Sequence, residues 1–436
     1  MSHFGTPNGD FFRTFALEIK QILSIAMSNS KLDVTRNYIR TMYSDGEEFR
    51  YDLLSRKTQI LDDNLQWRNL TDKDICTIAC NCAQATGANI TDREVRCVLG
   101  SDLVRDVHPL REYIRSLPAY NADHGIDFIK AASEQVRVAS GQEVWAEYFK
   151  KWFVAMVAGW MCDDVVNHQV LVLIGRQGTG KTTWLEHLLP PELRDYVTKQ
   201  ASVRELGKDD RIRIAEFGLI NMDEIDSCSP RELNVLKSLI TTADVNERAA
   251  YGHTKERRIR CASFCASGNN REFLSDDTGN RRWLPFEVNT IIDPFNSQLM
   301  YKEMYAQAWY LVQHRFRYWF DLQDICSLEA HNEDFRQTRN EEELLSVYFE
   351  PVEPTAAKAV FMTASEIHAK LKMWGNITTP MPLNKFGELL KRRGYPPRKL
   401  HSGKRGYVVK VTENLTDKQY QEIHELFSAA GAASTF

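Results

Sequence analysis

Residues 171–190 read LVLIGRQGTGKTTWLEHLLP, and this stretch decides the fold. Four apolar residues lead into the pattern Gly-x-x-x-x-Gly-Lys-Thr, and an amphipathic segment follows. A strand, a glycine-rich loop and a helix in this order are typical of a phosphate-binding loop. The pattern therefore predicts a site for ATP and Mg²⁺ at the positive end of the following helix. The residues expected to contact the nucleotide are Gly175, Gln177, Gly178, Thr179, Gly180, Lys181, Thr182 and Thr183.

A metal ion bound to phosphates needs acidic support, and the segment FGLINMDEID at residues 217–226 supplies it. We expect Lys181 to reach the outer phosphates and the Thr182 hydroxyl to ligate Mg²⁺. Asp223 is expected to hold the metal through water, and Glu224 to activate the attacking water. An adjacent Asp-Glu pair after an apolar strand favours an ATPase motor over a kinase.

Two further polar features follow along the chain. The strand-like segment RCASFCASGNN ends at Asn269, our first choice to orient the attacking water, and at Asn270, the alternative. An ordinary pair of loop asparagines would give the same letters. The segment SDDTGNRRW then contains Arg281 and Arg282, whose guanidinium groups suit a transferred phosphate. Two surface salt bridges are the other explanation for these arginines.

The order of elements predicts an α/β fold with several domains. Strand-like and helix-like segments alternate from Val170 to about Asn289, as in a P-loop NTPase core with a largely parallel sheet. A length of 436 residues allows about three domains. We expect a helical segment at 1–40, a small accessory α+β domain at 41–120, the ATPase motor at 121–345 and a basic domain with a mobile tail at 346–436. Thr71 and Thr91 are expected to cap helices in the accessory domain, which either binds DNA or supports the core.

Composition excludes some classes of protein. The net charge is only −4, so a nucleic-acid surface must come from local clusters of basic residues. The longest apolar run, at residues 152–161, is too short to span a bilayer, and a buried helix from Glu143 to Asp163 explains it better. The N-terminus does not have the pattern of a secretory signal. A cytoplasmic protein without a membrane partner is the expectation.

Several motifs together resemble those of the virulence-associated protein E family. The segments are DVHPLREYIRSLPAY, GRQGTGKTT, NMDEID, LKSLITTADVNERAAYG and REFLSDDTGNRRW, and they cover roughly residues 45–345 in order. The resemblance implies a superfamily 3 helicase-like ATPase (AAA+-like) of phages, plasmids and mobile elements, assembled as a ring, expected to be a hexamer, with ATP between subunits. It also implies that Arg281 or Arg282 acts on the neighbouring subunit's ATP. Where the family has Thr-x-Asn, this chain has Ser267-Gly268-Asn269. Many relatives also have primase activity, but we do not expect it of this chain.

Two basic clusters are expected to bind DNA. The segment RAAYGHTKERRIR at residues 248–260 predicts a hairpin, which in such rings projects into the channel around a single strand. The segments TASEIHAKL, LNKFGELLKRRGY and PRKLHSGKRGYVVKV give the helix–helix–hairpin order of a winged helix, which binds either duplex DNA or a protein. A capping box at Thr363 is expected to open the first of these helices. The expected DNA contacts are Arg248, Tyr251, His253, Lys255, Arg257, Arg258, Arg392, Arg393, Lys404 and Arg405.

The function expected from all these features is an ATP-driven DNA helicase or translocase that replicates a mobile genetic element. One alternative is an origin-binding or loader ATPase that binds DNA without unwinding it. Another alternative is a regulatory or defence ATPase whose ring acts as a switch.

Overall fold

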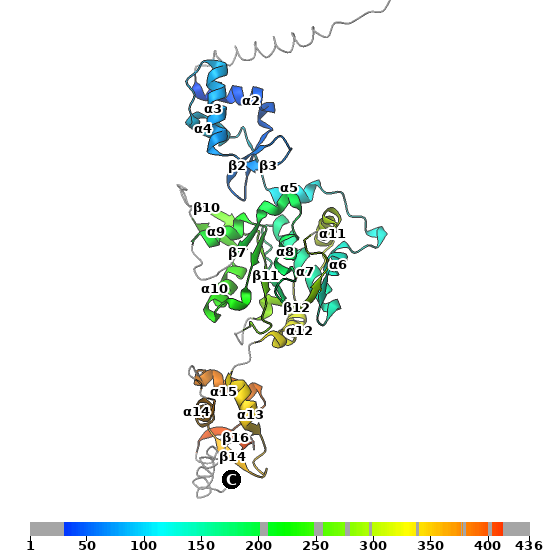
Figure 1. Cartoon of the computed structure of the whole chain (residues 1–436), viewed down its shortest axis with the longest axis vertical. Coiled ribbons are helices and arrows are strands. Elements are labelled where there is room, and N and C mark those ends of the chain that lie inside the picture. The colour runs from blue at the N-terminus through cyan, green and yellow to red at the C-terminus, as the bar shows by residue number, and fades with distance from the viewer. Residues whose placement is uncertain are drawn as a thin grey trace, which may run out of the picture. The chain divides into compact units, whose positions relative to one another are not determined.

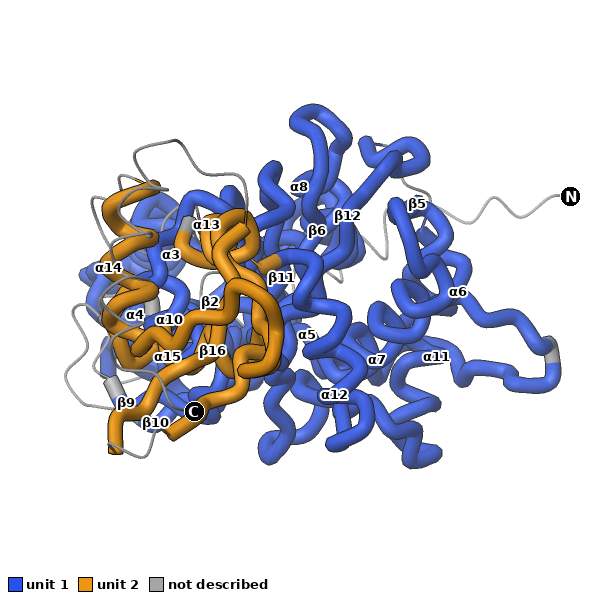
Figure 2. Tube along the Cα trace, turned by 90° about the horizontal axis from the view of Figure 1, so that it is seen from below, with its two compact units in different colours: residues 1–335 blue, residues 336–436 orange. Residues whose placement is uncertain are grey.

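The computed structural model describes residues 30–200, 208–247, 256–274, 280–295, 299–336, 340–375, 377, 381–399 and 403–412. Two compact units, residues 1–335 and residues 336–436, are coloured separately in Figure 2. Both units combine helices with strands, so the chain has the mixed α/β fold expected from the sequence (Figure 1). Most of the helical segment expected at 1–40 lies outside the described residues.

The accessory part of the first unit combines helices with a four-stranded sheet in the order β3-β2-β1-β4. Strands β1, β2 and β3 are antiparallel, and β4 joins β1 in parallel. Thr71 and Thr91 open helices α3 and α4 with capping boxes, which confirms the predicted caps. The elements are α2 (Lys31–Met42), β1 (Phe49–Asp52), β2 (Lys57–Leu61), β3 (Trp67–Asn69), α3 (Asp72–Thr86), α4 (Asp92–Leu99) and β4 (Arg105–Val107).

A six-stranded sheet in the order β5-β12-β6-β11-β8-β7 forms the centre of the first unit. The five strands from β12 to β7 are parallel, and β5 is antiparallel to β12. Its strands are β5 (Val136–Val138), β6 (Val170–Ile174), β7 (Val197–Gln200), β8 (Leu219–Met222), β11 (Ser263–Gly268) and β12 (Trp283–Ile291). The helices around it are α5 (Pro109–Ser116), α6 (Phe128–Ser133), α7 (Gln142–Met161), α8 (Lys181–Glu186), α9 (Lys208–Glu216), α10 (Pro230–Thr241), α11 (Tyr301–Gln313) and α12 (Leu322–Asn332).

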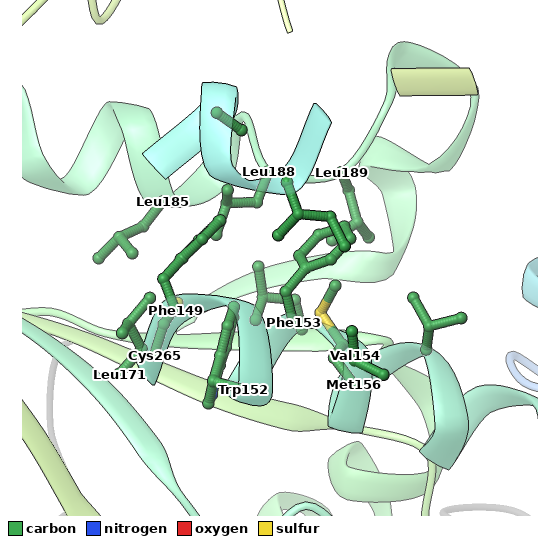
Figure 3. Packing of buried hydrophobic residues seen from close by; sticks show 14 of the residues in the cluster. Phe149, Trp152, Phe153, Val154, Met156, Leu171, Leu185, Leu188, Leu189 and Cys265 are labelled. Atoms are coloured by element: carbon green, nitrogen blue, oxygen red, sulfur yellow. The ribbon is translucent and has the colours of Figure 1, made fainter. Parts of the chain in front are cut away.

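Strand β6 is buried on both faces, as its unbroken apolar sequence requires. Leu171 and Leu173 pack with α7 and α11, whereas Val170, Val172 and Ile174 pack on the opposite face with α9 and α10. Figure 3 shows α7 contributing Phe149, Trp152 and Phe153 to the first of these cores. Helix α7 is therefore buried, as predicted for residues 143–163. In the described part of the chain, no helix is long and apolar enough to cross a membrane.

The accessory part and the central sheet belong to one compact unit, although the sequence suggested separate domains. The hydroxyl of Tyr196, the residue just before β7, donates to the fully buried Asp52 of β1 at 2.9 Å. Leu54 from the accessory hairpin and Leu110 and Ile114 from α5 are buried in the same core as α7. These contacts join residues far apart in the sequence, so no local signal marks them.

The second unit packs its helices on a small antiparallel sheet, in which β16 pairs with β13, β14 and β15. Thr363 opens α14 with the predicted capping box, and Gly394, with φ of 81°, follows the end of α15. Strands β15 and β16 form the predicted hairpin. The elements are α13 (Asn340–Tyr348), β13 (Phe349–Pro351), β14 (Ala359–Met362), α14 (Ala364–Trp374), α15 (Leu383–Arg392), β15 (Pro397–Lys399) and β16 (Arg405–Val411).

The second unit begins at Arg336, earlier than the expected boundary between residues 345 and 346. Glu342 of α13 is only 3% exposed and forms ion pairs with Arg336, Arg392 and Arg393. A buried carboxylate needs such partners, so α13 is part of this unit's interior. Two of these partners, Arg392 and Arg393, lie about 50 residues further along the chain, so no local pattern around Glu342 marks α13 as part of this unit.

Candidate functional site

The glycine-rich loop joins β6 to α8 at the carboxyl edge of the parallel sheet. Gly175 has φ of 153°, and a Cβ there would lie 2.7 Å from the Val288 carbonyl oxygen. At Gly180, with φ of 81°, a Cβ would overlap the ring of Pro294. Both positions therefore require glycine, because any side chain would push the loop away from β12.

Lys181 is the first residue of α8 and is only 6% exposed. Its Nζ donates to the carbonyl oxygens of Gly175 and Arg176, each at 2.8 Å, and lies 3.5 Å from Asn269 Oδ1. Burial lowers the pKa of Lys181, although the charges of Asp226 and Asp223 act in the opposite direction. The cation is thus held within the loop, where a phosphate group would complete its ligands.

Asp223 follows β8 and accepts hydrogen bonds on both oxygens. Its Oδ1 accepts from Ser267 Oγ at 2.6 Å and from Thr182 Oγ1 at 3.1 Å, and its Oδ2 pairs with Lys199 Nζ at 2.7 Å. Partial burial acts to raise the pKa of Asp223, but the hydrogen bonds from Lys199, Ser267 and Thr182 outweigh it and hold the pKa below its ordinary value. The carboxylate is therefore ionised and oriented beside the Thr182 hydroxyl.

Glu224 lies next to Asp223 with a left-handed backbone, φ 54° and ψ 45°. A residue other than glycine seldom adopts this conformation, and such strain is concentrated at functional sites. The side chain of Glu224 is exposed and lines the same cavity as Lys181. Glu224 is therefore accessible to solvent water and to a ligand, whereas Asp223 is not free to turn.

Strand β11 lies between β6 and β8, so its end is brought between Lys181 and Asp223. Asn269 lines the cavity, whereas the Asn270 side chain accepts the backbone N–H of Glu272 at 3.0 Å. The geometry thus favours Asn269 of the two. Asp226 fixes this turn by accepting the backbone N–H groups of both asparagines, at 3.1 and 2.8 Å.

These groups surround one cavity of about 270 Å³. Among the described residues, no three or more His, Cys, Asp or Glu side chains form a metal-binding group. A metal ion at Thr182 and Asp223 would therefore take its other ligands from phosphate or water, which is how Mg²⁺ is usually held. The lining residues are Gln177, Gly178, Gly180, Lys181, Thr182, Thr183, Asp223, Glu224, Ser267, Gly268, Asn269 and Phe295.

Sequence reasoning missed Lys199, Ser267 and Asp226. Lys199 comes from β7, an edge strand without a recognisable motif, and its ion pair follows from the strand order alone. Ser267 was noted only as the residue in place of the family's Thr, and its hydroxyl was given no role, although it replaces a polar residue in the Thr-x-Asn pattern. Asp226 follows the acidic pair in the sequence, but its backbone acceptor role has no sequence signal.

Arg281 and Arg282 lie away from this cavity. They immediately precede β12, whose first residue, Trp283, pairs with Val170 at the start of β6. The pKa of His168, just before β6, is lowered mainly by burial, then by Arg260, and also by Arg282 and Arg281. Both arginines are therefore near the amino edge of the sheet. The glycine-rich loop is at the opposite, carboxyl edge.

The two arginines differ in environment. Arg281 is exposed, whereas Arg282 is half-buried and its Nε has no hydrogen-bond partner among the described residues. Burial, followed by the charge of Arg281, lowers the pKa of Arg282. Within the described chain, neither arginine forms the surface salt bridge that was the alternative explanation.

The first basic cluster is described only in part. Strands β9 (Asp244–Glu247) and β10 (Glu256–Ile259) form the expected antiparallel pair. Arg257 pairs with Asp244 at 2.7 Å. Arg258 is 7% exposed and pairs with Glu216 at 2.8 Å, so we no longer expect it to contact DNA. The remaining expected contacts of this cluster, Arg248, Tyr251, His253 and Lys255, lie outside the described residues.

The C-terminal cluster is partly structural. Arg392 and Arg393 hold the buried Glu342, and Lys404 pairs with Glu366 at 3.0 Å. Arg405 is exposed and lies opposite Lys399 on the β15–β16 hairpin, and within the described chain no ion pair involves either residue. Arg392, Arg393 and Lys404 are exposed as well, so Lys399 and Arg405 differ from them in having no acidic partner within the described chain.

Comparison with known proteins gives the chain a family. A search of curated proteins found no match. The chain is similar to the apo structure of the NrS-1 C-terminal region, with a TM-score of 0.45 and 11% identity over 87% of this chain and 99% of that chain. The A form apo structure of that region gives a TM-score of 0.42 and 11% identity, with the same coverage. The family model of the virulence-associated protein E-like domain matches residues 119–341, a little more than half of the chain. With this match, and as its motifs predicted, the chain belongs to the virulence-associated protein E-like domain family.

Proposed function

We propose that this protein is a Mg²⁺-dependent ATPase motor that moves along or unwinds DNA as a ring. One observation carries the ATPase assignment. The buried Lys181 ammonium, the Thr182–Asp223 pair and the exposed Glu224 meet at one cavity on the carboxyl edge of a parallel sheet. Ligands of open α/β sheets bind at this edge.

The residues fit a nucleotide with its metal ion. Lys181 would exchange its contacts with the Gly175 and Arg176 carbonyls for the outer phosphates, and Thr182 would ligate Mg²⁺ directly. Asp223, already ionised, would hold a water of the metal. When bound, the metal neutralises charge that develops on the phosphates. Glu224 would accept a proton from the attacking water, which Asn269 would orient.

The position of the arginines supports an assembly of several subunits. Arg281 and Arg282 are at the amino edge of the sheet, so they are remote from the phosphates of their own subunit. A head-to-tail ring brings the two unlike faces of neighbouring subunits together at every interface. In such a ring either arginine would stabilise the phosphate transferred in the adjacent site.

The DNA part of the proposal rests on the two basic clusters. Strands β9 and β10 flank residues 248–255 in the sequence, and four of the expected channel contacts belong to that segment. In the second unit, helices α14 and α15 are followed by the hairpin of β15 and β16, which is the order of a winged helix. Lys399 and Arg405 are exposed on that hairpin. Phosphate contacts by such residues would supply DNA affinity without sequence preference.

The test separates nucleotide binding, hydrolysis and unwinding. Lys181→Ala should abolish binding of a fluorescent ATP analogue, because the outer phosphates lose their cation. Glu224→Gln should bind the analogue normally but release no phosphate, because the water loses its base. Hydrolysis at the wild-type rate by Glu224→Gln would show that the acidic assignment is wrong.

Forked DNA distinguishes the helicase from the alternatives. The wild-type protein with ATP and Mg²⁺ should separate the strands, and the Glu224→Gln variant should bind the same fork without separating it. DNA binding and ATP hydrolysis without strand separation would favour the loader or the regulatory ring.

A further inference from the structure

Phe295 is an aromatic residue on the rim of the proposed nucleotide cavity. Phe295 lies in the turn after β12, next to Pro294, and 67% of its surface is exposed to solvent. Pro294 lies against Gly180, and its carbonyl oxygen is 3.2 Å from Nδ1 of His187, just after α8. The start of this turn is therefore held against the glycine-rich loop, which fixes Phe295 at the cavity.

The other residues that line the cavity are polar or lack a side chain. Among the described lining residues, Phe295 alone is aromatic. An exposed phenyl ring leaves apolar surface in water, which costs free energy in proportion to the area. A flat ligand group that covers the ring would remove this cost.

The strand order predicts which end of a bound nucleotide lies on which side of β6. Asp223, Glu224 and Asn269, which would act on the terminal phosphate, follow β8 and β11 on one side of β6. Phe295 follows β12 on the other side of β6. A triphosphate held at Lys181 with its terminal group toward β11 would extend its nucleoside toward β12.

We propose that Phe295 is the platform on which the nucleobase stacks. The inference rests on the proposed ATPase function and adds the substrate class to it. A phenyl ring stacks on any base and offers no hydrogen bond that distinguishes one base from another. The site therefore takes nucleoside triphosphates through the face of the base, and Phe295 contributes equally to the affinity for ATP and GTP.

The experiment compares ligands with and without a base. ATP, GTP and inorganic tripolyphosphate, each with Mg²⁺, are titrated into the full-length wild type, Phe295→Ala and Phe295→Tyr by calorimetry. Phe295→Ala should weaken ATP and GTP alike by about 5- to 150-fold, the range of base–aromatic stacking. Tripolyphosphate affinity should be unchanged, and Phe295→Tyr should restore the affinity for both nucleotides.

The outcomes separate the inference from the proposed function. Unchanged ATP affinity in Phe295→Ala overturns the inference alone. Equal weakening of ATP and tripolyphosphate also overturns it, because Phe295 would then shape the loop or a subunit contact. If the wild type binds neither ATP nor tripolyphosphate, the proposed function fails and the inference fails with it.

Discussion

Replacing Arg281 with alanine should stop ATP hydrolysis in the neighbouring subunit without affecting ATP binding in its own. Trp283, which begins β12, pairs with Val170, and Glu287 pairs with Ile174 at the carboxyl edge. Four residue steps along a parallel strand span about 13 Å, and Arg281 lies before the strand begins. Its guanidinium is therefore too far away to reach the phosphates of its own subunit, and in the proposed ring it would act on the site of the neighbouring subunit. Loss of such an arginine costs about 10³-fold or more in turnover.

Mixing two inactive proteins gives a quantitative prediction. An interface works when it combines the intact Lys181 of an Arg281→Ala subunit with the intact Arg281 of a Lys181→Ala subunit. In an equal mixture each condition holds for half of the positions, so about one quarter of the interfaces of a head-to-tail ring should be complete. If interfaces act independently, the mixture should recover about one quarter of the wild-type rate.

The assay is phosphate release after the two proteins have exchanged subunits, with assembly followed by native mass spectrometry. The matched control mixes Lys181→Ala with the double variant Lys181→Ala/Arg281→Ala, which offers no complete interface and should stay inactive. Running Arg282→Ala in parallel identifies which arginine acts. The reasoning is refuted if mixed rings assemble but recover no activity with either arginine variant.

Three other predictions concern the loop, the metal and DNA. Gly175→Ala should lower the free energy of unfolding by about 3 kcal/mol in urea denaturation, because its Cβ meets the Val288 carbonyl. A Cβ at Gly178 would have nothing within 4 Å, so Gly178→Ala should lower the free energy of unfolding by only about 1 kcal/mol. Equal losses in the two variants would contradict the clash at Gly175. Lys199→Met should lower the Mg²⁺ concentration needed for nucleotide binding by about 3-fold, because the ammonium group no longer competes for Asp223. The effect is small because the lysine side chain is 50% exposed, and a higher Mg²⁺ requirement would contradict the prediction. Joint replacement of Lys399 and Arg405 by alanine should reduce the salt dependence of DNA affinity by about two units of slope, whereas an unchanged slope would assign the hairpin to protein contacts.

The sequence predicted the parts of the site that depend on neighbouring residues. A strand, a glycine-rich loop and a helix are a local pattern, so Lys181 and Thr182 were found from the letters alone. Asp223 was found because an apolar strand precedes it. The side chains that complete the site come from elements whose neighbours are set by the strand order. Lys199 reaches Asp223 only because β7 pairs with β8.

The two basic clusters show why charge patterns predicted less well than the loop. A run of arginines has the same letters whether the side chains face solvent or a buried acid. Arg258 and Arg393 both turned out to hold acidic partners, Glu216 and Glu342. These partners are separated by 42 and 51 residues in the sequence, beyond the reach of any helix or hairpin pattern.

The hydrogen bond between Tyr196 and Asp52 affects which fragments of this protein can fold on their own. The family match begins at residue 119, but the folded unit does not. A fragment starting there would lose Asp52, the acceptor of the Tyr196 hydroxyl, and α5, whose Leu110 side chain lies against Gly218. The severed face would expose apolar core beside β7, the strand that carries Lys199. The smallest fragment expected to fold therefore includes the hairpin that starts at Phe49, and an excised family segment is expected to aggregate.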